Sequence, residues 1–105
     1  MVDTVDTIAA YSAAGAISAG PGVARLTATT EADFTLANAS GLTTDAIQRD
    51  ISNESSVAHN VTGNFVHGNV TSGKLVIAPG GYVRLRATGN AAWRVVSHNR
   101  GVTIL

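Results

Sequence analysis

The sequence predicts an all-β fold, in the form of a small antiparallel β-sandwich or jelly roll, on three observations. Roughly eight to ten short segments alternate apolar and polar residues with the period of two that a strand requires. Turns rich in Gly, Pro, Asn and Ser separate them at intervals of about 8–12 residues, the spacing typical of sandwiches and small barrels. No sustained helical periodicity follows residue 22. With 105 residues, the chain has the size of one domain.

The clearest strand pattern lies in the last third of the chain. Residues 75–77 form an apolar run that ends at residues 79–81, where Pro and Gly favour a turn. Residues 83–88 then alternate between apolar and polar side chains, Gly89 and Asn90 supply a turn, and residues 93–97 alternate again. We therefore expect three short strands joined by two turns.

Further strands are expected upstream of this stretch and at the C-terminus. They are predicted at residues 23–28, 34–36, 46–52, 57–61, 64–67 and 102–105. The polar stretch Asn-Ala-Ser-Gly that begins at Asn38 ends the second of them. A helix over residues 44–51, capped by Thr44 or Asp45, is the alternative for the third. A strand is preferred because the run is short and turn residues follow it.

Residues 1–22 are predicted to form an extended N-terminal arm, which leaves residues 23–105 as the β-sandwich domain. A short strand is expected near residues 4–11, and another at residues 16–18. The Gly-Pro-Gly sequence that ends at Gly22 marks the boundary. A frayed terminus is the alternative. An arm of this kind packs its apolar residues on a partner, and the candidates for that contact are Val5, Ile8, Tyr11 and Ile17.

The core is expected to form from the inward positions of the predicted strands around the single tryptophan. Trp is large and apolar, so one copy in a small chain is expected to fill the centre of the fold. The predicted core residues are Leu26, Leu36, Ile77, Val83, Leu85, Trp93 and Val95.

Charge is balanced over the chain but unevenly placed along it. Residues 1–54 carry all seven acidic residues, whereas five of the seven basic residues lie in residues 55–105. With a formal net charge of zero, no overall field attracts nucleic acid or an anionic membrane. Charges of the two halves can neutralise each other across strands. Alternatively, outward-facing Arg84, Arg86 and Arg94 form a basic patch suited to an acidic protein partner.

The residues offer little for catalysis or cofactor binding. The chain has no Cys, which excludes disulfides, thiolate metal ligands and thiol catalysis. His59 and His67 are eight residues apart, a spacing that can place both on one face, and His98 is isolated. No metal site, cofactor site or catalytic set is predicted within one chain, although a His on an oligomer axis stays an option. No Gly-x-Ser-x-Gly motif is present. We expect that the protein is not an enzyme.

No signal peptide is predicted, because the N-terminus lacks a basic region followed by a long apolar core. No apolar run approaches the ~18 residues of a membrane span. The chain begins with Met1, and we expect it to be a complete protein.

The order of these motifs resembles a family of small bacteriophage virion domains, most closely the head decoration (cement) proteins. The matching pieces are residues 34–36, 47–53, 59–62, 75–85 and 93–96. The resemblance covers about residues 15–105. It implies a β-sandwich or jelly-roll fold, a homotrimer, and no enzymatic activity.

The resemblance also implies a location and a partner. A decoration protein is made in the host cytoplasm and binds the major capsid protein on the outer surface of the virion, where it stabilises the head. The predicted N-terminal arm favours this role. The alternative is a receptor-binding or glycan-binding tip of a tail fibre or spike. Its contact candidates are Tyr82 and residues 60–72, within which Phe65 is either core or contact.

Overall fold

The chain folds into ten β-strands, and the residues that the structure describes, 7–19, 21–39, 47–88 and 91–105, contain no helix. The protein is described by a computed structural model. The strands are β1 (Thr7–Tyr11), β2 (Gly15–Ile17), β3 (Gly22–Leu26), β4 (Asp33–Leu36), β5 (Gln48–Asn53), β6 (His59–His67), β7 (Val70–Ile77), β8 (Tyr82–Ala87), β9 (Trp93–His98) and β10 (Val102–Ile104). The all-β prediction is confirmed.

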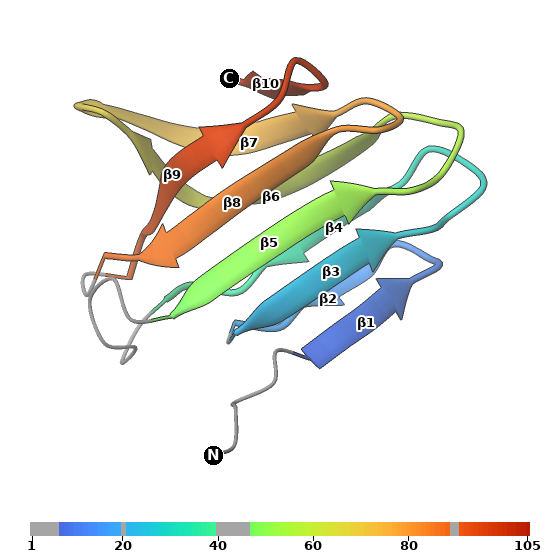
Figure 1. Cartoon of the computed structure of the whole chain (residues 1–105), viewed down its shortest axis with the longest axis horizontal. Helices are drawn as coiled ribbons and strands as arrows, with labels where there is room; N and C mark the ends of the chain where they lie inside the picture. Colours follow the sequence, from blue (N-terminus) through green and yellow to red (C-terminus); the bar gives the residue numbers. More distant parts are fainter. Residues whose placement is uncertain (1–6, 20, 40–46, 89–90) are drawn as a thin grey trace.

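The first six strands wind as a coil. The chain passes from β1 to β2, returns to β3 beside β1, and continues in the same way to β4, β5 and β6. As a result β1, β3 and β5 pair in parallel, and β2, β4 and β6 pair in parallel behind them (Figure 1). Consecutive strands do not pair with each other, because the chain crosses between the two groups after each one.

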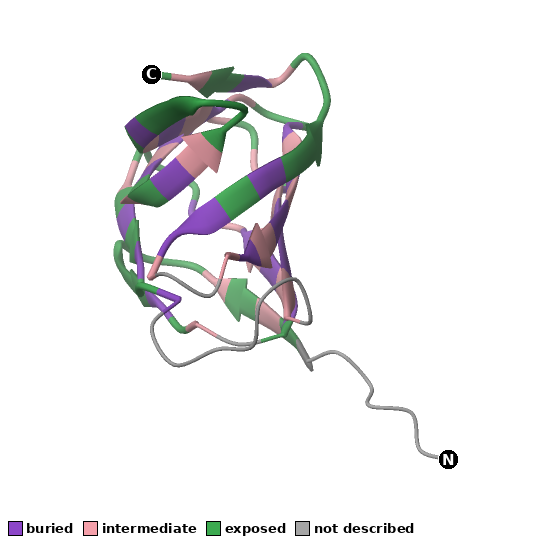
Figure 2. Cartoon of the chain, turned by 90° about the vertical axis from the view of Figure 1, so that its left-hand side faces the viewer, coloured by how far each residue is buried: buried purple, intermediate pink, exposed green. Residues whose placement is uncertain are grey.

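The last four strands add antiparallel partners at one end of this coil. β8 pairs with β5 and β9, while β7 pairs with β6 and β10. A short parallel pairing of β6 with β9 joins the two groups into one ten-stranded sheet. The sheet curls until it is nearly closed, in the manner of a barrel, with β1 and β2 at the two ends of its strand order (Figures 1 and 2).

The prediction of antiparallel strands is wrong for the first half of the sheet. Alternation of apolar and polar residues reveals a half-buried strand but not the direction of its neighbour. Parallel neighbours need a crossover between them, and here each crossover is itself a strand of the opposite group. The sandwich or jelly-roll arrangement is not confirmed.

The segment predicted as an N-terminal arm belongs in part to the sheet. β1 pairs with β3 along five residues and β2 pairs with β4 along three. Ile17 is fully buried in the core, since it faces inward beside Leu36. The arm is therefore not confirmed for residues 7–17. The predicted strand start near Thr4 and the contact residue Val5 lie outside the described residues.

Other strand boundaries differ from the predictions in particular ways. The two segments predicted at residues 57–61 and 64–67 form one strand, β6, with an irregularity between Thr62 and Phe65. β7 begins at Val70, earlier than expected. β5 is a strand, as preferred over a helix, although Thr44 and Asp45 lie outside the described part of the chain. The predicted turn at Gly89 and Asn90 also falls outside it.

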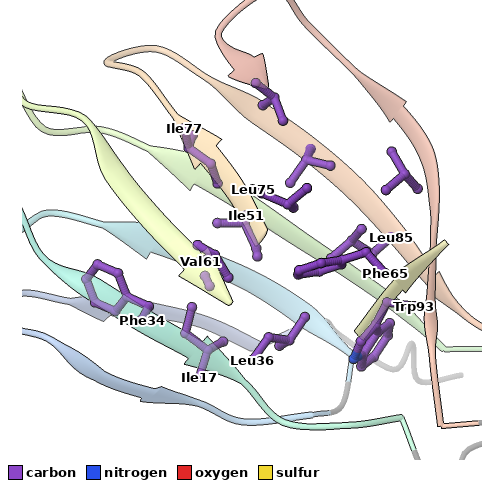
Figure 3. Close-up of a cluster of buried hydrophobic side chains, with 14 of the residues drawn as sticks. Ile17, Phe34, Leu36, Ile51, Val61, Phe65, Leu75, Ile77, Leu85 and Trp93 are labelled. Atoms are coloured by element: carbon purple, nitrogen blue, oxygen red, sulfur yellow. The ribbon is translucent and has the colours of Figure 1, made fainter. Parts of the chain in front are cut away.

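The core lies inside the curled sheet, between the two groups of strands. All seven side chains predicted for it are buried there. Phe34, Phe65, Ile51, Val61 and Leu75 join them (Figure 3). Alternation of buried and outward residues along the strands is visible in Figure 2. The Trp93 indole N–H donates a hydrogen bond to the Ala37 carbonyl oxygen at 2.9 Å, so its polar atom is satisfied within the core.

We predict that Trp93→Ala lowers the free energy of unfolding by roughly 3–5 kcal/mol, because it opens a cavity in the core. Trp93→Phe should cost less, since it keeps most of the packed volume. Urea denaturation followed by circular dichroism measures both changes. A loss below about 1 kcal/mol for the alanine variant would contradict the central position of this ring.

Candidate functional site on the outer face of β5, β8 and β9

Strand alternation directs a row of polar side chains to the outside of β5, β8 and β9. Along β8, Val83, Leu85 and Ala87 face the core, so Tyr82, Arg84 and Arg86 face outward. The antiparallel register sets Gln48 beside Arg86 and Asp50 beside Arg84. On the other side of β8, Arg94 of β9 lies beside Arg86. We call this surface the basic face: Gln48, Asp50, Tyr82, Arg84, Arg86 and Arg94.

Asp50 is the centre of a hydrogen-bond network on the basic face. Arg84 Nε lies 3.3 Å from Asp50 Oδ1, and Arg84 Nη2 donates to the Tyr82 hydroxyl at 2.8 Å. Gln48 Nε2 donates to the other oxygen of Asp50 at 3.4 Å. The Arg84 guanidinium also lies over the Tyr82 ring, 5.9 Å from its centroid. These contacts hold Arg84 in one orientation.

Among the described residues of the basic face, three are arginines and one, Asp50, is a carboxylate. Arg84 is paired with Asp50, and Arg86 Nη2 donates to the neutral Gln48 amide oxygen at 3.2 Å. Arg86 and Arg94 are direct cross-strand neighbours. Like charges in that arrangement cost stability, and the cost falls when an anion lies beside them. The basic face therefore brings Arg84, Arg86 and Arg94 close together on neighbouring strands.

The network changes the ionisation of two of its members. Burial raises the pKa of Tyr82 above its ordinary value of 10.0, and the hydrogen bond and negative charge of Asp50 add to this rise, while Arg84 opposes it. The hydrogen bond and charge of Asp50 likewise raise the pKa of Arg84. Arg84 therefore stays positively charged at neutral pH.

The three histidines are not brought together. His59 is fully buried: its Nδ1 accepts a hydrogen bond from the Ala32 N–H at 3.1 Å, and its Nε2 lies 2.9 Å from the Ser55 hydroxyl. His67 is exposed at the end of β6, so the expectation of one shared face is wrong. His67 instead packs edge-on against His98, with ring centroids 5.8 Å apart.

Buried polar groups near His59 are satisfied by the chain itself. The Asn53 amide donates to the carbonyl oxygens of Val57 and Ile77, both at 2.8 Å. Its oxygen accepts from the Ser55 N–H and hydroxyl. This cluster fixes the connection between β5 and β6, and its role is structural.

The alternation of residues 46–52 places Arg49 on one face with Ile47 and Ile51. Arg49 faces inward on β5 and is only 3% exposed. Its Nη2 donates to the Tyr11 hydroxyl at 3.3 Å, and its Nε has no hydrogen-bond partner in the part of the chain that the structure describes. Among the described residues no carboxylate pairs with it. The strand pattern predicts the face that Arg49 shares with Ile51, but it does not show that the Tyr11 hydroxyl is its hydrogen-bond partner.

The residues predicted to contact a partner through the arm are separated by the fold. Ile8 is 65% exposed on the outer side of β1. Tyr11 is half-buried, faces inward, and packs edge-on against Phe34. Ile17 lies within the core. Of the three that the structure describes, only Ile8 is therefore available to a partner on the outer surface.

Nothing in the described part of the molecule has the form of a reaction centre. Its surface has no pocket, and no group of three or more His, Asp or Glu side chains gathers as metal ligands do. No helix that could cross a membrane occurs in the described ranges. No protein-family model, curated protein or solved structure matches this chain. The basic face is thus the candidate site on the described surface.

We predict that Arg49→Met leaves the melting temperature unchanged or raises it. Methionine keeps most of the buried volume and removes a buried charge that has no counter-ion in the described structure. Arg49→Ala serves as the control and should lower the melting temperature, because it leaves a cavity. A clear loss of stability in the methionine variant would show that the guanidinium has a compensating partner.

We predict that Asp50→Asn lowers the pKa of Tyr82, because it removes a negative charge that disfavours the phenolate while Arg84 stays in place. Since the folded-state pKa is raised, the stability from this group is present below the ordinary pKa of tyrosine. It is lost as the pH rises through the raised value. The chain has two tyrosines, so phenolate absorbance is titrated in a Tyr11→Phe background. Glu31→Gln is the control, and an unchanged or higher Tyr82 midpoint in Asp50→Asn would contradict the network.

Proposed function

We propose that this protein is a structural virion protein, a bacteriophage head decoration protein that binds the major capsid protein on the outer surface of the capsid. The motif order over residues 15–105 supports the family. The observation that supports a binding role is the basic face, where Arg86 and Arg94 lie side by side and Arg84 is held by Asp50. The expected capsid contact is acidic, by charge complementarity.

The proposal includes the arrangement that the resemblance implies. In it, the strand groups β1-β3-β5-β8-β9 and β2-β4-β6-β7-β10 act as the two layers of a sandwich, and several copies associate. An oligomer engages several capsid sites at once, so contacts that are individually weak add up through multivalency. The resemblance implies three copies, but the proposed capsid binding requires only that more than one copy associates. No catalytic step belongs to this role.

The alternative of a tail-fibre tip has less support. Phe65 is buried in the core, so it is not available to a glycan. Of the aromatic candidates this leaves Tyr82, which is half-buried and already engaged by Arg84.

We predict that purified protein binds undecorated capsids saturably and that Arg86→Glu/Arg94→Glu weakens this binding by about tenfold or more. Charge reversal replaces attraction to an acidic surface by repulsion, and added salt should weaken the wild-type complex. Lys74→Glu/Arg100→Glu is the matched control, since it makes the same change of charge away from the basic face. Cosedimentation with capsids measures binding.

Two results would contradict the proposal. An equal loss of capsid binding in the control variant would mean that binding depends on overall charge and not on the basic face. Absence of wild-type binding would exclude decoration of these capsids and direct the test to host-surface glycans. Deletion of residues 2–22 is not a suitable test, because it removes β1, β2 and the buried Ile17 from the folded domain.

A further inference from the structure

The two ends of the strand order meet at one side of the molecule and are not closed onto each other. In the described sheet, β1 pairs only with β3 and β2 pairs only with β4. The two strands are joined by residues 12–14, so they belong to the first turn of the coil (Figure 1). Each therefore carries a row of backbone N–H and C=O groups along its outer edge that no other described strand occupies.

These edges lack the features that usually prevent strand addition. The residues of β1 and β2, Thr7–Tyr11 and Gly15–Ile17, include no charged residue and no proline. The register of β1 against β3 runs without a bulge along all five residues. Ile8 faces outward on β1 and has the largest exposed fraction of the large apolar side chains in the described chain. An edge of this kind favours pairing with another strand.

We propose that this side of the molecule binds a second copy of the same chain, through antiparallel pairing of the two β1 strands about a two-fold axis. Full overlap of the five residues centres the pairing on Ala9, which then lies opposite the partner subunit's Ala9. Ile8 lies beside the partner subunit's Ala10 on the outer surface. The sheet group β1-β3-β5-β8-β9 continues from one subunit into the other.

The geometry favours a second copy over another occupant for two reasons. A strand paired antiparallel with itself is self-complementary, and a two-fold interface closes after two copies. The axis that relates the β1 strands is perpendicular to the sheet, so it also brings the two β2 edges to face each other. One operation thus covers the free edges of β1 and β2, and the described β1 and β2 strands bring no charges to repel each other.

This inference does not rest on capsid binding, since it concerns only the edges of the sheet. It predicts a dimer, whereas the resemblance to decoration proteins implies a trimer. Because the basic face lies on β5, β8 and β9, away from the β1 edge, the dimer leaves it accessible on both subunits.

The first test is the mass of the full chain in solution, measured by sedimentation equilibrium. We expect a dimer for the wild type. Ile8→Lys/Ala10→Lys brings four lysines together across the axis and should raise the dimer dissociation constant by about tenfold or more. Ile8→Glu/Ala10→Lys should restore the dimer, because each Glu then lies beside a Lys of the other subunit. Thr103→Lys, on β10, is the control.

A cysteine variant tests the register even if the lysine variants fold poorly. The chain has no Cys, so Ala9→Cys introduces a single thiol that faces its own copy across the axis. Directly paired strand residues lie within the Cα separation that a disulfide spans. We expect Ala9→Cys to form a covalent dimer rapidly on mild oxidation, and Thr103→Cys to form little covalent dimer. A monomer or a trimer in sedimentation, or equal cross-linking by both cysteines, would overturn the proposal.

Discussion

The parallel pairing of β6 with β9 is the contact on which the closed form of this sheet depends. It consists of the pairs Phe65 with Trp93 and Val66 with Arg94, and it is the described pairing that joins the two five-stranded groups. Both aromatic rings of the first pair point into the core and are fully buried. Aromatic cross-strand pairs are among the stronger ones in a sheet. A short backbone contact is thus reinforced where the two groups meet.

The β6–β9 pairing joins the two strand groups at one side of the molecule, whereas β1 and β2 at the opposite side are not paired with each other. At the closed side, antiparallel strands adjoin the coil, and the described pairings leave β10 with a partner on one edge, β7. At the open side, β1 and β2 present uncharged edges. Coil-like folds are commonly capped at both ends, because an exposed end pairs with other chains. Here the sheet caps one end of the coil, and a second copy is the proposed cap of the other.

Polar residues inside the curled sheet are of two kinds. Asn53 and His59 are buried and hydrogen-bonded by nearby backbone and by Ser55, which makes them part of a rigid connection between strands. Arg49 is buried with one neutral partner, the Tyr11 hydroxyl. A charge held in this way costs stability unless something compensates it. The hydrogen bond from Arg49 to Tyr11 also links β5 to β1, the third and first of these parallel strands.

The sequence by itself determined the positions of most strands and the identity of the core. Alternation with a period of two indicates which side chains of a strand face the core. This pattern depends only on residues that are neighbours along the chain. For that reason Leu85 and Trp93 were correctly placed inside, and Arg84 and Arg86 outside. The same local signal identified the outward basic residues of the candidate site.

Only the tertiary structure decided which strands are neighbours and in which direction they run. Parallel and antiparallel partners leave the same alternation in a strand, so the coil of β1 to β6 had no distinct signature. Pairing also decided that Ile17 is core and not part of a free arm, and that Tyr11 of β1 is the hydrogen-bond partner of Arg49. Such outcomes depend on contacts between residues far apart in the chain, which a local pattern does not contain.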